Sequence, residues 1–522
     1  MLTSVVIPCF DGADDTRACL QALSASVGVG PLEIVIVDNG SRDPAALAAA
    51  AAHPCARLVT LPENLGFAGG CNRGLEAARG DILVVLNNDT LPAPTMLSRL
   101  RRALAAEPAP ALVAPVSNFV RGEACLPVGN LGRSEEGRRT IERMLEERCG
   151  GMLQDADNLA GLCLMFHRDL WRAVGPFDER FGFGNHEDDD LCLRVRLRGG
   201  RLVVARDAFL HHWGSRTFRA MGVDYDAQLA RTGALMRAKW QDEPAWQAVQ
   251  AVSAGDLEGA GCLAAAALAQ SPAWPDGQLI LARAAHARGD HGSAVELATA
   301  FLRACPASWP GHKTRTVALI GTGRLRDAIA AARAAITICP VENEHAAALL
   351  TQVAHGLLAK SELASARETL LAALELSENG ERFCLLGRLC ATLGDRPAAD
   401  RAFAGAAAAG HEDGLLLRGI NLWHHGDHAA ALRTLGAAVA NAPEDARAHE
   451  FLAQALAACA GVGTDTSAAE RALSEARSRA RSEAPSDAER GSAGTRAVRT
   501  AELREPSRAS TDAEVAASHR RG

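Results

Sequence analysis

The pattern of hydrophobic and polar positions changes twice along the chain. Up to about Arg237, short apolar runs bounded by Pro, Gly, Asn or Asp alternate with segments of helical periodicity. Such runs are typical of strands that are buried on both faces of a parallel sheet. The alternation predicts a doubly wound α/β sheet that binds ligands at the carboxyl ends of its strands. We expect strands at Ser4–Ile7, Glu33–Val37, Leu58–Leu61 and Ile82–Leu86, and helices at Asp14–Ala25, Pro44–Ala52, Gly69–Ala78 and Pro94–Ala105.

From about Trp246 to Ala460 the sequence repeats itself. The repeat is marked by turn glycines, the first three about 34 residues apart, which is the tetratricopeptide period: Gly255, Gly289, Gly323, Gly394 and Gly426. The unit around Ser361 lacks this glycine but keeps its small residues. The pattern predicts an all-α array that resembles a tetratricopeptide superhelix with a concave face. Cys305 and Cys339 occupy equivalent positions just before a proline, so we interpret them as packing residues.

The last segment, from Gly461 to Gly522, is rich in Ser, Arg, Glu and Ala and has few large apolar residues. Such a composition cannot bury enough apolar surface to offset the entropy lost on ordering. We therefore predict a disordered tail, with a short helix possible across Ser467–Arg481. The predicted organisation is an α/β domain over residues 1–240, helical repeats over 246–460 and the tail over 461–522.

Composition narrows the class of protein. The net charge of −7 gives no basic footprint, so nucleic acid is not expected as the main ligand. The 14 cysteines occur singly, without CxxC pairs or zinc spacing, which suits reduced thiols in a cytoplasmic protein. The first ten residues lack the features of a signal peptide, and no apolar run approaches the ~20 residues that span a bilayer. We expect a cytoplasmic protein without a transmembrane segment, which would approach any lipid substrate peripherally.

A carboxylate follows one of the predicted strands directly. Asp38 comes after Glu33–Val37, where it can accept hydrogen bonds from a nucleotide base or ribose. The alternative is a strand-end turn, because Asp favours turns. Farther along, Gly69 and Gly70 would let the backbone approach a ligand before a helix opens.

The strand Ile82–Leu86 delivers Asn87, Asn88 and Asp89 at its carboxyl end. Phosphate chemistry needs a hard divalent cation, because the charge of a leaving diphosphate must be neutralised. One carboxylate is enough to begin such a site, since the diphosphate oxygens supply further ligands. The alternative explanation is a turn of Asn and Asp residues that caps the strand.

Four consecutive acids, from Glu187 to Asp190, precede a predicted helix. Capping by the helix dipole is one explanation for acids at this position. Adjacent carboxylates also repel one another, which can raise the pKa of one of them into the range of a general base. Two further strands are expected at Leu202–Ala205 and Ala208–His211, ending in His211-His212-Trp213. A histidine pair beside carboxylates suits metal ligation, with a structural role as the alternative.

These segments together resemble glycosyltransferase family 2, the inverting GT-A transferases, and in particular its bacterial rhamnosyltransferase-like members. The resemblance covers roughly Leu2 to Phe218 and rests on six motifs in the family's order: VVIPCF, IVIVDNGS, ENLGFAGGCNRG, LNNDT, FDERFG…EDDDLC and HHWGS. It implies a GT-A fold and a nucleoside-diphosphate sugar as donor. It also implies a hydroxyl acceptor on a glycan, a lipid-linked sugar or a protein, and Mg²⁺ or Mn²⁺ as cofactor.

The resemblance also implies roles for single residues. Asp188 would be the base that deprotonates the acceptor, although Asp189 and Asp190 remain open as alternatives. Asp89 would hold the metal as the surviving acid of the family's Asp-x-Asp motif, whose first acid is Asn87 here. His211, or less favourably His212, would complete the metal site. The remaining implied contacts are with the nucleotide sugar, from Pro8, Phe10, Asp38, Gly69, Gly70, Asn72 and Asn88, and with the acceptor, from Glu187 and Trp213.

Two other functions are compatible with parts of the sequence. The chain could be a peptide-binding scaffold with a degenerate transferase domain, although Asp38, Asp89, the acid cluster and the histidine pair are all present. It could also be a nucleotidyltransferase, but PCFDGADD replaces the usual Gly-rich, basic phosphate loop after the first strand. The repeat array could be a spacer or oligomerisation surface, or its concave face could present a protein acceptor.

Overall fold

The computed structural model describes residues 1–214, 224–339, 343–459, 466–467, 469–471 and 473–474. It divides into two compact units, Met1–Thr322 with Ala330–Val341, and Gly323–Ile329 with Glu342–Gly522. The first unit therefore extends past residue 240 and includes the first repeat helices. Almost all of the predicted tail over 461–522 lies outside the described residues. Within the described ranges, no helix is both long and apolar enough to cross a membrane.

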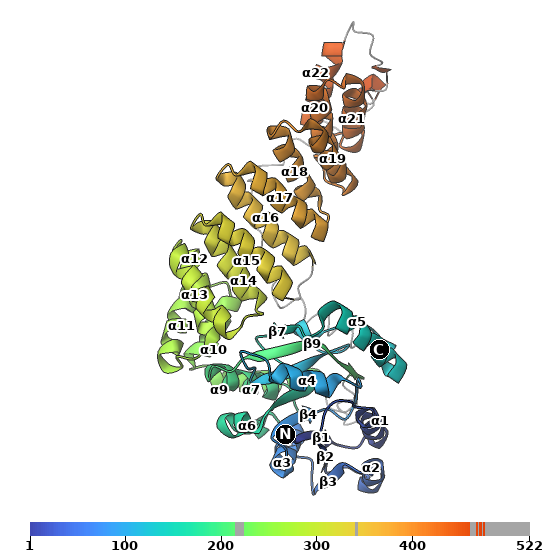
Figure 1. The fold of residues 1–522 in the computed structure, drawn as a ribbon, viewed down its shortest axis with the longest axis vertical. Helices are drawn as coiled ribbons and strands as arrows, with labels where there is room; N and C mark the ends of the chain where they lie inside the picture. The colour runs from blue at the N-terminus through green and yellow to red at the C-terminus, as the bar shows by residue number, and fades with distance from the viewer. Residues whose placement is uncertain (215–223, 340–342, 460–465, 468, 472, 475–522) are drawn as a thin grey trace, which may run out of the picture. The chain divides into compact units, whose positions relative to one another are not determined.

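The described part of the first unit contains a nine-stranded mixed sheet in the order β3-β2-β1-β4-β8-β6-β9-β5, with β7 also paired to β9 (Figure 1). The ladders β3–β2–β1–β4 and β6–β9 are parallel, whereas β8, β5 and β7 pair antiparallel with their neighbours. The strands are β1 Thr3–Cys9, β2 Leu32–Asn39, β3 Ala56–Leu61, β4 Ile82–Leu86, β5 Thr90–Pro92, β6 Leu112–Ser117, β7 Leu153–Asp155, β8 Cys163–His167 and β9 Leu202–His212.

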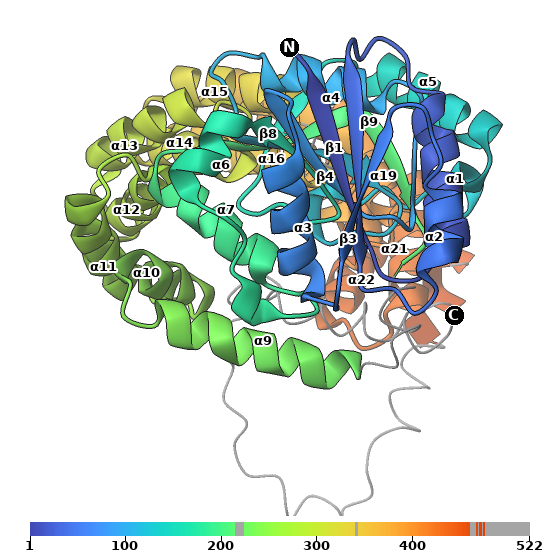
Figure 2. The ribbon, with the colours of Figure 1, turned by 90° about the horizontal axis from the view of Figure 1, so that it is seen from below.

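Helices cover both faces of this sheet, as a doubly wound fold requires. Alternate strand residues supply the two cores, because side chains alternate across a strand. One core packs α1, α2 and α4 on Val5, Ile7 and their neighbours, and the other packs α3, α5, α6 and α7 on Val6, Val35 and theirs. Figure 2 shows α1 and α2 on one side of β1–β3 and α3 on the other. These helices are α1 Ala13–Ser24, α2 Pro44–Ala50, α3 Gly66–Ala77, α4 Met96–Leu104, α5 Glu135–Cys149, α6 Arg168–Val174 and α7 Glu187–Leu197, with short 3-10 turns at Gly122–Ala124, Leu131–Arg133 and Glu179–Phe181.

The sequence predicts two strands near the end of this domain, but the structure has one. β9 runs without interruption from Leu202 to His212. The polar residues Arg206 and Asp207, which suggest a turn, lie beside a register shift between Pro115 and Val116 of the neighbouring β6. The strand absorbs this irregularity and continues.

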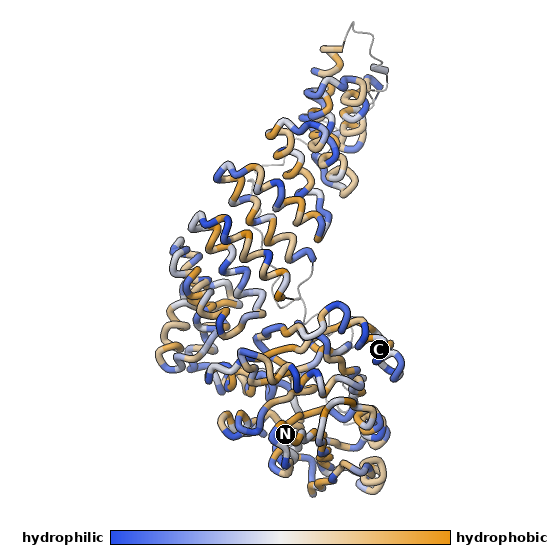
Figure 3. The backbone as a smooth tube through the Cα atoms, viewed as in Figure 1, coloured by the Kyte–Doolittle hydropathy of each residue, from blue (hydrophilic) through white to orange (hydrophobic). Residues whose placement is uncertain are grey.

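Paired helices follow the sheet domain and form a repeat array. Each helix buries one side, and Figure 3 shows the resulting alternation of hydrophobic and hydrophilic segments along the repeat helices. The helices are α9 Tyr225–Trp240, α10 Pro244–Ser253, α11 Leu257–Gln270, α12 Pro275–Ala287, α13 His291–Ala304, α14 Trp309–Gly321, α15 Leu325–Ile338, α16 Asn343–Ala359, α17 Leu363–Leu376, α18 Gly380–Thr392, α19 Arg396–Ala408, α20 Gly414–His425, α21 His428–Asn441 and α22 Ala446–Cys459.

The recurring Gly-Asp pairs make the turns of this array. Gly255 has φ 82°, and the Asp256 amide donates back to the Ala251 carbonyl at 2.9 Å. This is the Schellman arrangement that ends a helix at glycine. The Asp256 side chain then accepts from the Gly259 amide at 2.8 Å and caps the next helix. The pairs at Gly289, Gly394 and Gly426 repeat the positive φ and the aspartate cap.

The unit without a turn glycine uses Ser361 instead. Ser361 has φ 60°, in the left-handed region that favours glycine. The Glu362 amide still donates to the Leu357 carbonyl at 3.0 Å, so the turn is the same. The Glu362 side chain makes no capping hydrogen bond to the following helix. This turn is therefore the strained member of the series.

Candidate active site

The carboxyl ends of β1 and β2 lie side by side, with Cys9 opposite Asp38. Asp38 is buried, and its carboxylate accepts a hydrogen bond from the Ser41 amide at 2.9 Å. Pro8 and Phe10 are half-buried beside it. Asp11 and Arg42 join the two loops through an ion pair. A cavity of about 280 Å³ opens between these loops, lined by Asp11, Gly12, Ala13, Arg42, Asp43, Ala46 and Leu47.

Helix α3 packs against this edge with its two glycines inside the helix. α3 begins at Gly66, so Gly69 and Gly70 lie within its first turns rather than before it. A Cβ on Gly70 would lie 3.2 Å from the Pro8 Cβ, and one on Gly69 would lie 2.6 Å from the Leu65 Cβ. These glycines therefore allow close packing of α3 on β1 and on its own preceding turn.

Asn72 is committed to other parts of the protein. Its amide nitrogen donates to the Phe177 carbonyl and to Glu179, both at 2.9 Å, and its amide oxygen accepts from the Phe177 amide at 2.9 Å. Asn39, which the sequence reasoning did not select, has a similar role. It holds the turn before α3 through Asn64, Leu65 and Gly66. Both asparagines position the backbone around the site.

Asp89 meets a histidine at the end of β9. Its carboxylate oxygen Oδ1 lies 3.4 Å from Nε2 of His212, and both side chains are largely buried. Nδ1 of His212 lies 2.9 Å from the Phe119 carbonyl, which can only accept, so Nδ1 carries the proton. In the neutral ring, Nε2 then presents its lone pair toward Asp89. Burial opposes the charged form of His212, but the Asp89 carboxylate raises the pKa of His212 above its usual value.

The sequence favours His211 as the metal ligand, but the imidazole beside Asp89 belongs to His212. The reason is strand register: Thr90 pairs with His212 and Leu91 with His211. Since side chains alternate along β9, His211 faces the other side of the strand. Its ring lies edge-on to the indole of Trp213, with centroids 5.1 Å apart. Trp213 in turn carries the Arg133 guanidinium over its ring at 4.7 Å.

The other members of the Asn87–Asp89 turn also have defined places. The Asn88 amide donates to the Thr16 hydroxyl of α1 at 3.2 Å. The Asn87 side-chain oxygen is buried and has no hydrogen-bond partner among the described residues. Within the same ranges, no three His, Cys, Asp or Glu side chains lie close enough together to hold a metal ion by themselves. Asp89 and His212 could offer an oxygen and a nitrogen to a cation, and the described residues place no third such side chain beside them.

Helix α7 starts after a strained loop. Gly182, Gly184, Asn185 and His186 all have positive φ, between 68° and 126°. Two of these residues are not glycine, and such strain persists only where surrounding contacts enforce it. α9 supplies those contacts: Gln228 donates to the Gly184 carbonyl at 3.0 Å, and Nδ1 of His186 lies 3.0 Å from the Thr232 hydroxyl. The start of α7 is therefore fixed by tertiary structure.

Asp188 lies on the first turn of α7 and is half-buried. Its Oδ2 accepts a hydrogen bond from the Gly161 amide at 2.7 Å. Leu162, the next residue, accepts one through its carbonyl from the Asn87 amide at 3.1 Å. Asp188 is thereby tied to the end of β4 that also carries Asp89. Burial and the charge of Asp189 raise the pKa of Asp188 to about 6.

The neighbours of Asp188 have separate environments. Glu187 is 4% exposed, and its Oε2 has no hydrogen-bond partner among the described residues. Burial and the Asp188 charge raise the pKa of Glu187 well above its usual value, so it favours the protonated form. The Asp189 carboxylate accepts a hydrogen bond from Asn158.

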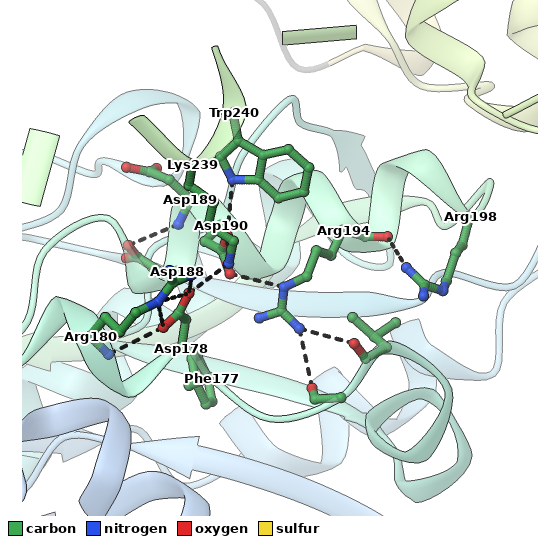
Figure 4. A network of polar contacts seen from close by, with 12 residues as sticks. Phe177, Asp178, Arg180, Asp188, Asp189, Asp190, Arg194, Arg198, Lys239 and Trp240 are labelled. Carbon is green, nitrogen blue, oxygen red and sulfur yellow. Dashed lines mark hydrogen bonds and ion pairs between the residues drawn. The ribbon is translucent and has the colours of Figure 1, made fainter. Parts of the chain in front are cut away.

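Asp190 is occupied by structural contacts, which Figure 4 shows. It accepts from Arg194 and from the Trp240 indole, each at 2.9 Å, and pairs with Lys239 at 2.5 Å. Lys239 also pairs with Asp178 at 2.7 Å. This network joins α7, α9 and the loop before α7, and it occupies the carboxylate of Asp190.

Comparisons with known proteins concern the N-terminal part of the chain. Residues 4–147 match the family model described as Glycosyl transferase family 2. The N-terminal part of the chain therefore contains a glycosyltransferase family 2 domain. The match to this family supports sugar transfer as the kind of reaction.

Two relatives extend the similarity beyond residue 147. The Succinoglycan biosynthesis protein ExoO of Rhizobium meliloti (strain 1021) is 28% identical over 241 residues, which cover 44% of this chain and 67% of the relative. The N-acetylglucosaminyl-diphospho-decaprenol L-rhamnosyltransferase of Mycobacterium tuberculosis (strain ATCC 25618 / H37Rv) is 26% identical over 216 residues, covering 36% of this chain and 69% of that protein. A crystal structure of GalNAc-T7 with UDP, GalNAc and Mn2+ gives a TM-score of 0.31 at 13% identity, covering 40% of this chain and 43% of that one. A TM-score this low does not inform the site.

Proposed function

We propose that this protein is an inverting glycosyltransferase that moves a sugar from a nucleoside-diphosphate donor to an acceptor hydroxyl, with Asp188 as the base. The acceptor O–H proton passes to the Asp188 carboxylate. The acceptor oxygen forms a bond to the anomeric carbon while the bond from that carbon to the diphosphate oxygen breaks. The electron pair leaves with the nucleoside diphosphate, and a single displacement inverts the configuration.

The observation that carries this proposal is the link from Asp188 to Asn87. The hydrogen bonds at Gly161 and Leu162 link the carboxylate to Asn87, the residue after β4 and two residues before Asp89. A pKa near 6 suits a group that must accept a proton near neutral pH. Asp190 is a poorer candidate for the base, because Arg194, Trp240 and Lys239 bind its carboxylate.

The donor would lie across the carboxyl ends of β1, β2 and β4. We assign the nucleoside to Asp38, Pro8 and Phe10 and the cavity beside them. Gly69, Gly70 and Asn72 act by shaping the backbone around this end of the sheet rather than by direct contact. Asn88 acts through Thr16 of α1, the helix that follows β1.

A divalent cation, Mg²⁺ or Mn²⁺, fits the donor set of Asp89 and His212. Carboxylate oxygen and imidazole nitrogen are both suitable ligands, and the Phe119 carbonyl orients the ring as outer contacts do in metal sites. When bound, such a cation neutralises charge on the departing diphosphate. The protein supplies two ligands here, so the diphosphate oxygens would provide others.

The acceptor would approach from the side of Asp188. Two relatives support its class, one named for succinoglycan biosynthesis and the other for rhamnosyl transfer to a lipid-linked sugar. We propose a glycan or a lipid-linked sugar as acceptor, with Glu187 and Trp213 near it. A protein acceptor presented by the repeat array is the alternative that the test below must distinguish.

The test uses the full chain and a panel of nucleotide sugars, each with and without Mn²⁺. We expect one donor to raise the melting temperature only when Mn²⁺ is present. Release of its nucleoside diphosphate should then depend on an added glycan or lipid-linked acceptor and not on an added protein acceptor. Binding of no donor, or donor binding without any transfer to the three acceptor classes, would favour a scaffold with a degenerate transferase domain instead.

A further inference from the structure

Helix α7 carries Asp188 at one end and is held by the repeat array at the other. Asp188 lies on the first turn, and Arg196 lies on the last. The two residues are about 12 Å apart along the helix axis, at 1.5 Å per residue. Both residues belong to one helix of 11 residues, so a contact at Arg196 bears on the placement of Asp188.

The contact at Arg196 is an ion pair between this buried guanidinium and a half-buried carboxylate of the second repeat hairpin. Arg196 is 3% exposed, and its Nε donates to Oδ2 of Asp276, on the first turn of α12, at 2.8 Å. A second nitrogen of Arg196 donates to Oδ1 of the same carboxylate. The Trp274 indole donates to Asp276 Oδ2 at 3.1 Å, and Arg196 Nη1 lies 3.4 Å from the sulfur of Cys305. This bidentate ion pair therefore joins two residues, Arg196 and Asp276, that are 80 positions apart in the sequence.

The surroundings make this pair obligatory. A buried guanidinium is costly unless a carboxylate accompanies it. Leu197, the next residue, packs into the apolar cluster that α10, α11 and α12 form around Trp274. A Cβ on Gly199 would lie 2.9 Å from the Ala273 Cβ, so the chain leaving α7 also touches the array.

A second buried contact lies beside the first. Asp155 of β7 and Arg201, just before β9, are 3% and 5% exposed and pair at 2.5 Å. The same Asp155 carboxylate accepts from the Ala307 amide, between α13 and α14, at 2.7 Å. The Asp155 amide donates to the Ala307 carbonyl at 3.3 Å. The first repeat hairpins are thus bound to both the helix and the strands that frame the site.

We propose that Asp276 is a positioning residue for sugar transfer: through Arg196 it holds α7 so that Asp188 remains on the Gly161 amide at the end of β4. This inference rests on the proposed function of Asp188. It makes the second repeat hairpin a working part of the transferase. The array then does more than carry or present a partner.

Hydrogen exchange tests the mechanical part without any substrate. In the full chain, Asp276→Asn should speed exchange of the α7 amides and of the Gly161 amide, which donates to Asp188. The matched control is Glu296→Gln on the neighbouring helix α13, where the side chain is exposed. It should leave both regions unchanged. Faster exchange confined to α12 and α13 in Asp276→Asn would overturn the proposal.

Kinetics test the functional part with the donor found in the panel. Asp276→Asn should lower kcat by about 10–100-fold, because small misplacements of a catalytic group cost this much, while KM for the donor changes less than about twofold. Asp276→Glu, which keeps the charge, should recover part of kcat. A kcat equal to that of Glu296→Gln, or a loss that only mirrors a smaller fraction of folded protein, would contradict the positioning role.

A milder variant covers the case in which Asp276→Asn does not fold. Trp274→Phe keeps the ring in the apolar cluster and removes one hydrogen bond to Asp276. We expect the same pattern at smaller amplitude, about 2–5-fold in kcat, with faster exchange at Gly161. Unchanged exchange at Gly161 would refute the mechanical link. Faster exchange with no transferase activity in the native chain would instead refute the proposed function alone.

Discussion

The Asp188 carboxylate and the Gly161 amide are joined by a hydrogen bond of 2.7 Å. Gly161 precedes the strand that pairs with β4, so this bond fixes the acid relative to Asp89. A Cβ on Gly161 would lie 3.4 Å from the Asp188 Cβ and from the Phe67 ring. The hydrogen bond and this close packing together fix the position of the carboxylate.

Replacement of the base should separate catalysis from donor binding. Asp188→Asn keeps the shape of the side chain but cannot accept the acceptor's proton. We expect kcat to fall by about 10²–10⁴-fold, the usual contribution of a well-placed base, with donor affinity nearly unchanged. Steady-state rates and donor titration by thermal shift measure the two quantities. Asp169→Asn, an exposed acid on α6, is the control and should retain full activity.

The rate should depend on pH through the same group. Because the base must be ionised, kcat/KM should rise as pH increases through about 6, the raised pKa of Asp188. The negative charge of Asp189 contributes to this rise in pKa, so Asp189→Asn should shift the acidic limb to lower pH. A limb that stays in place in Asp189→Asn, or one that survives in Asp188→Asn, would identify a different base.

The same shift has a consequence for stability. A carboxyl whose pKa is raised on folding favours the folded state when it is protonated. The contribution of Asp188 to the free energy of unfolding is therefore full below about pH 4, the pKa of an aspartate in the unfolded chain. This contribution is lost as pH rises through about 6, the pKa of Asp188 in the folded protein. Asp188→Asn removes this dependence. As pH rises between these values, the free energy of unfolding of the variant should therefore increase relative to that of the native chain.

Metal removal should abolish transfer reversibly. We expect EDTA to stop the reaction and Mn²⁺ or Mg²⁺ to restore it. His212→Ala should raise the Mn²⁺ concentration needed for half-maximal activity by about 10–100-fold. The exposed His424 on α20 provides the control, and His424→Ala should behave like the native chain. Equal metal requirements in the native chain and in His212→Ala would exclude His212 as a ligand.

The strained turn at Ser361 offers a stabilising change. Ser361→Gly removes a left-handed serine and should stabilise the repeat region by about 1 kcal/mol, since this conformation costs L residues roughly 1–2 kcal/mol. Gly394→Ser makes the opposite change at the equivalent turn of the next hairpin and should destabilise by a similar amount. Urea unfolding of the two variants measures both. Shifts of the same sign would contradict the explanation.

The sequence predicted local structure well wherever a few adjacent residues determine it. The Gly-Asp turns of the repeats need only a left-handed residue and a capping carboxylate, and both are visible in the sequence. The missing glycine at Ser361 was likewise visible. The strands β1 to β4 follow from short apolar runs that end in turn residues.

The sequence could not predict features that depend on register or on distant packing. Whether His211 or His212 faces Asp89 depends on how β5 pairs with β9, and a shift of one residue reverses the answer. Four adjacent acids look alike in sequence. Asp190 nevertheless differs from the other three, because Lys239 and Trp240, some 50 residues away, bind its carboxylate. Nothing near Arg196 indicates that its partner is Asp276.

The contacts of the second hairpin, α12–α13, and of the turn after it set a limit on how such chains can evolve. Deleting this hairpin would strip the carboxylate of Asp276 from Arg196, a charged group buried inside the protein. Lineages of this protein should therefore keep the spacing between α7 and this hairpin constant.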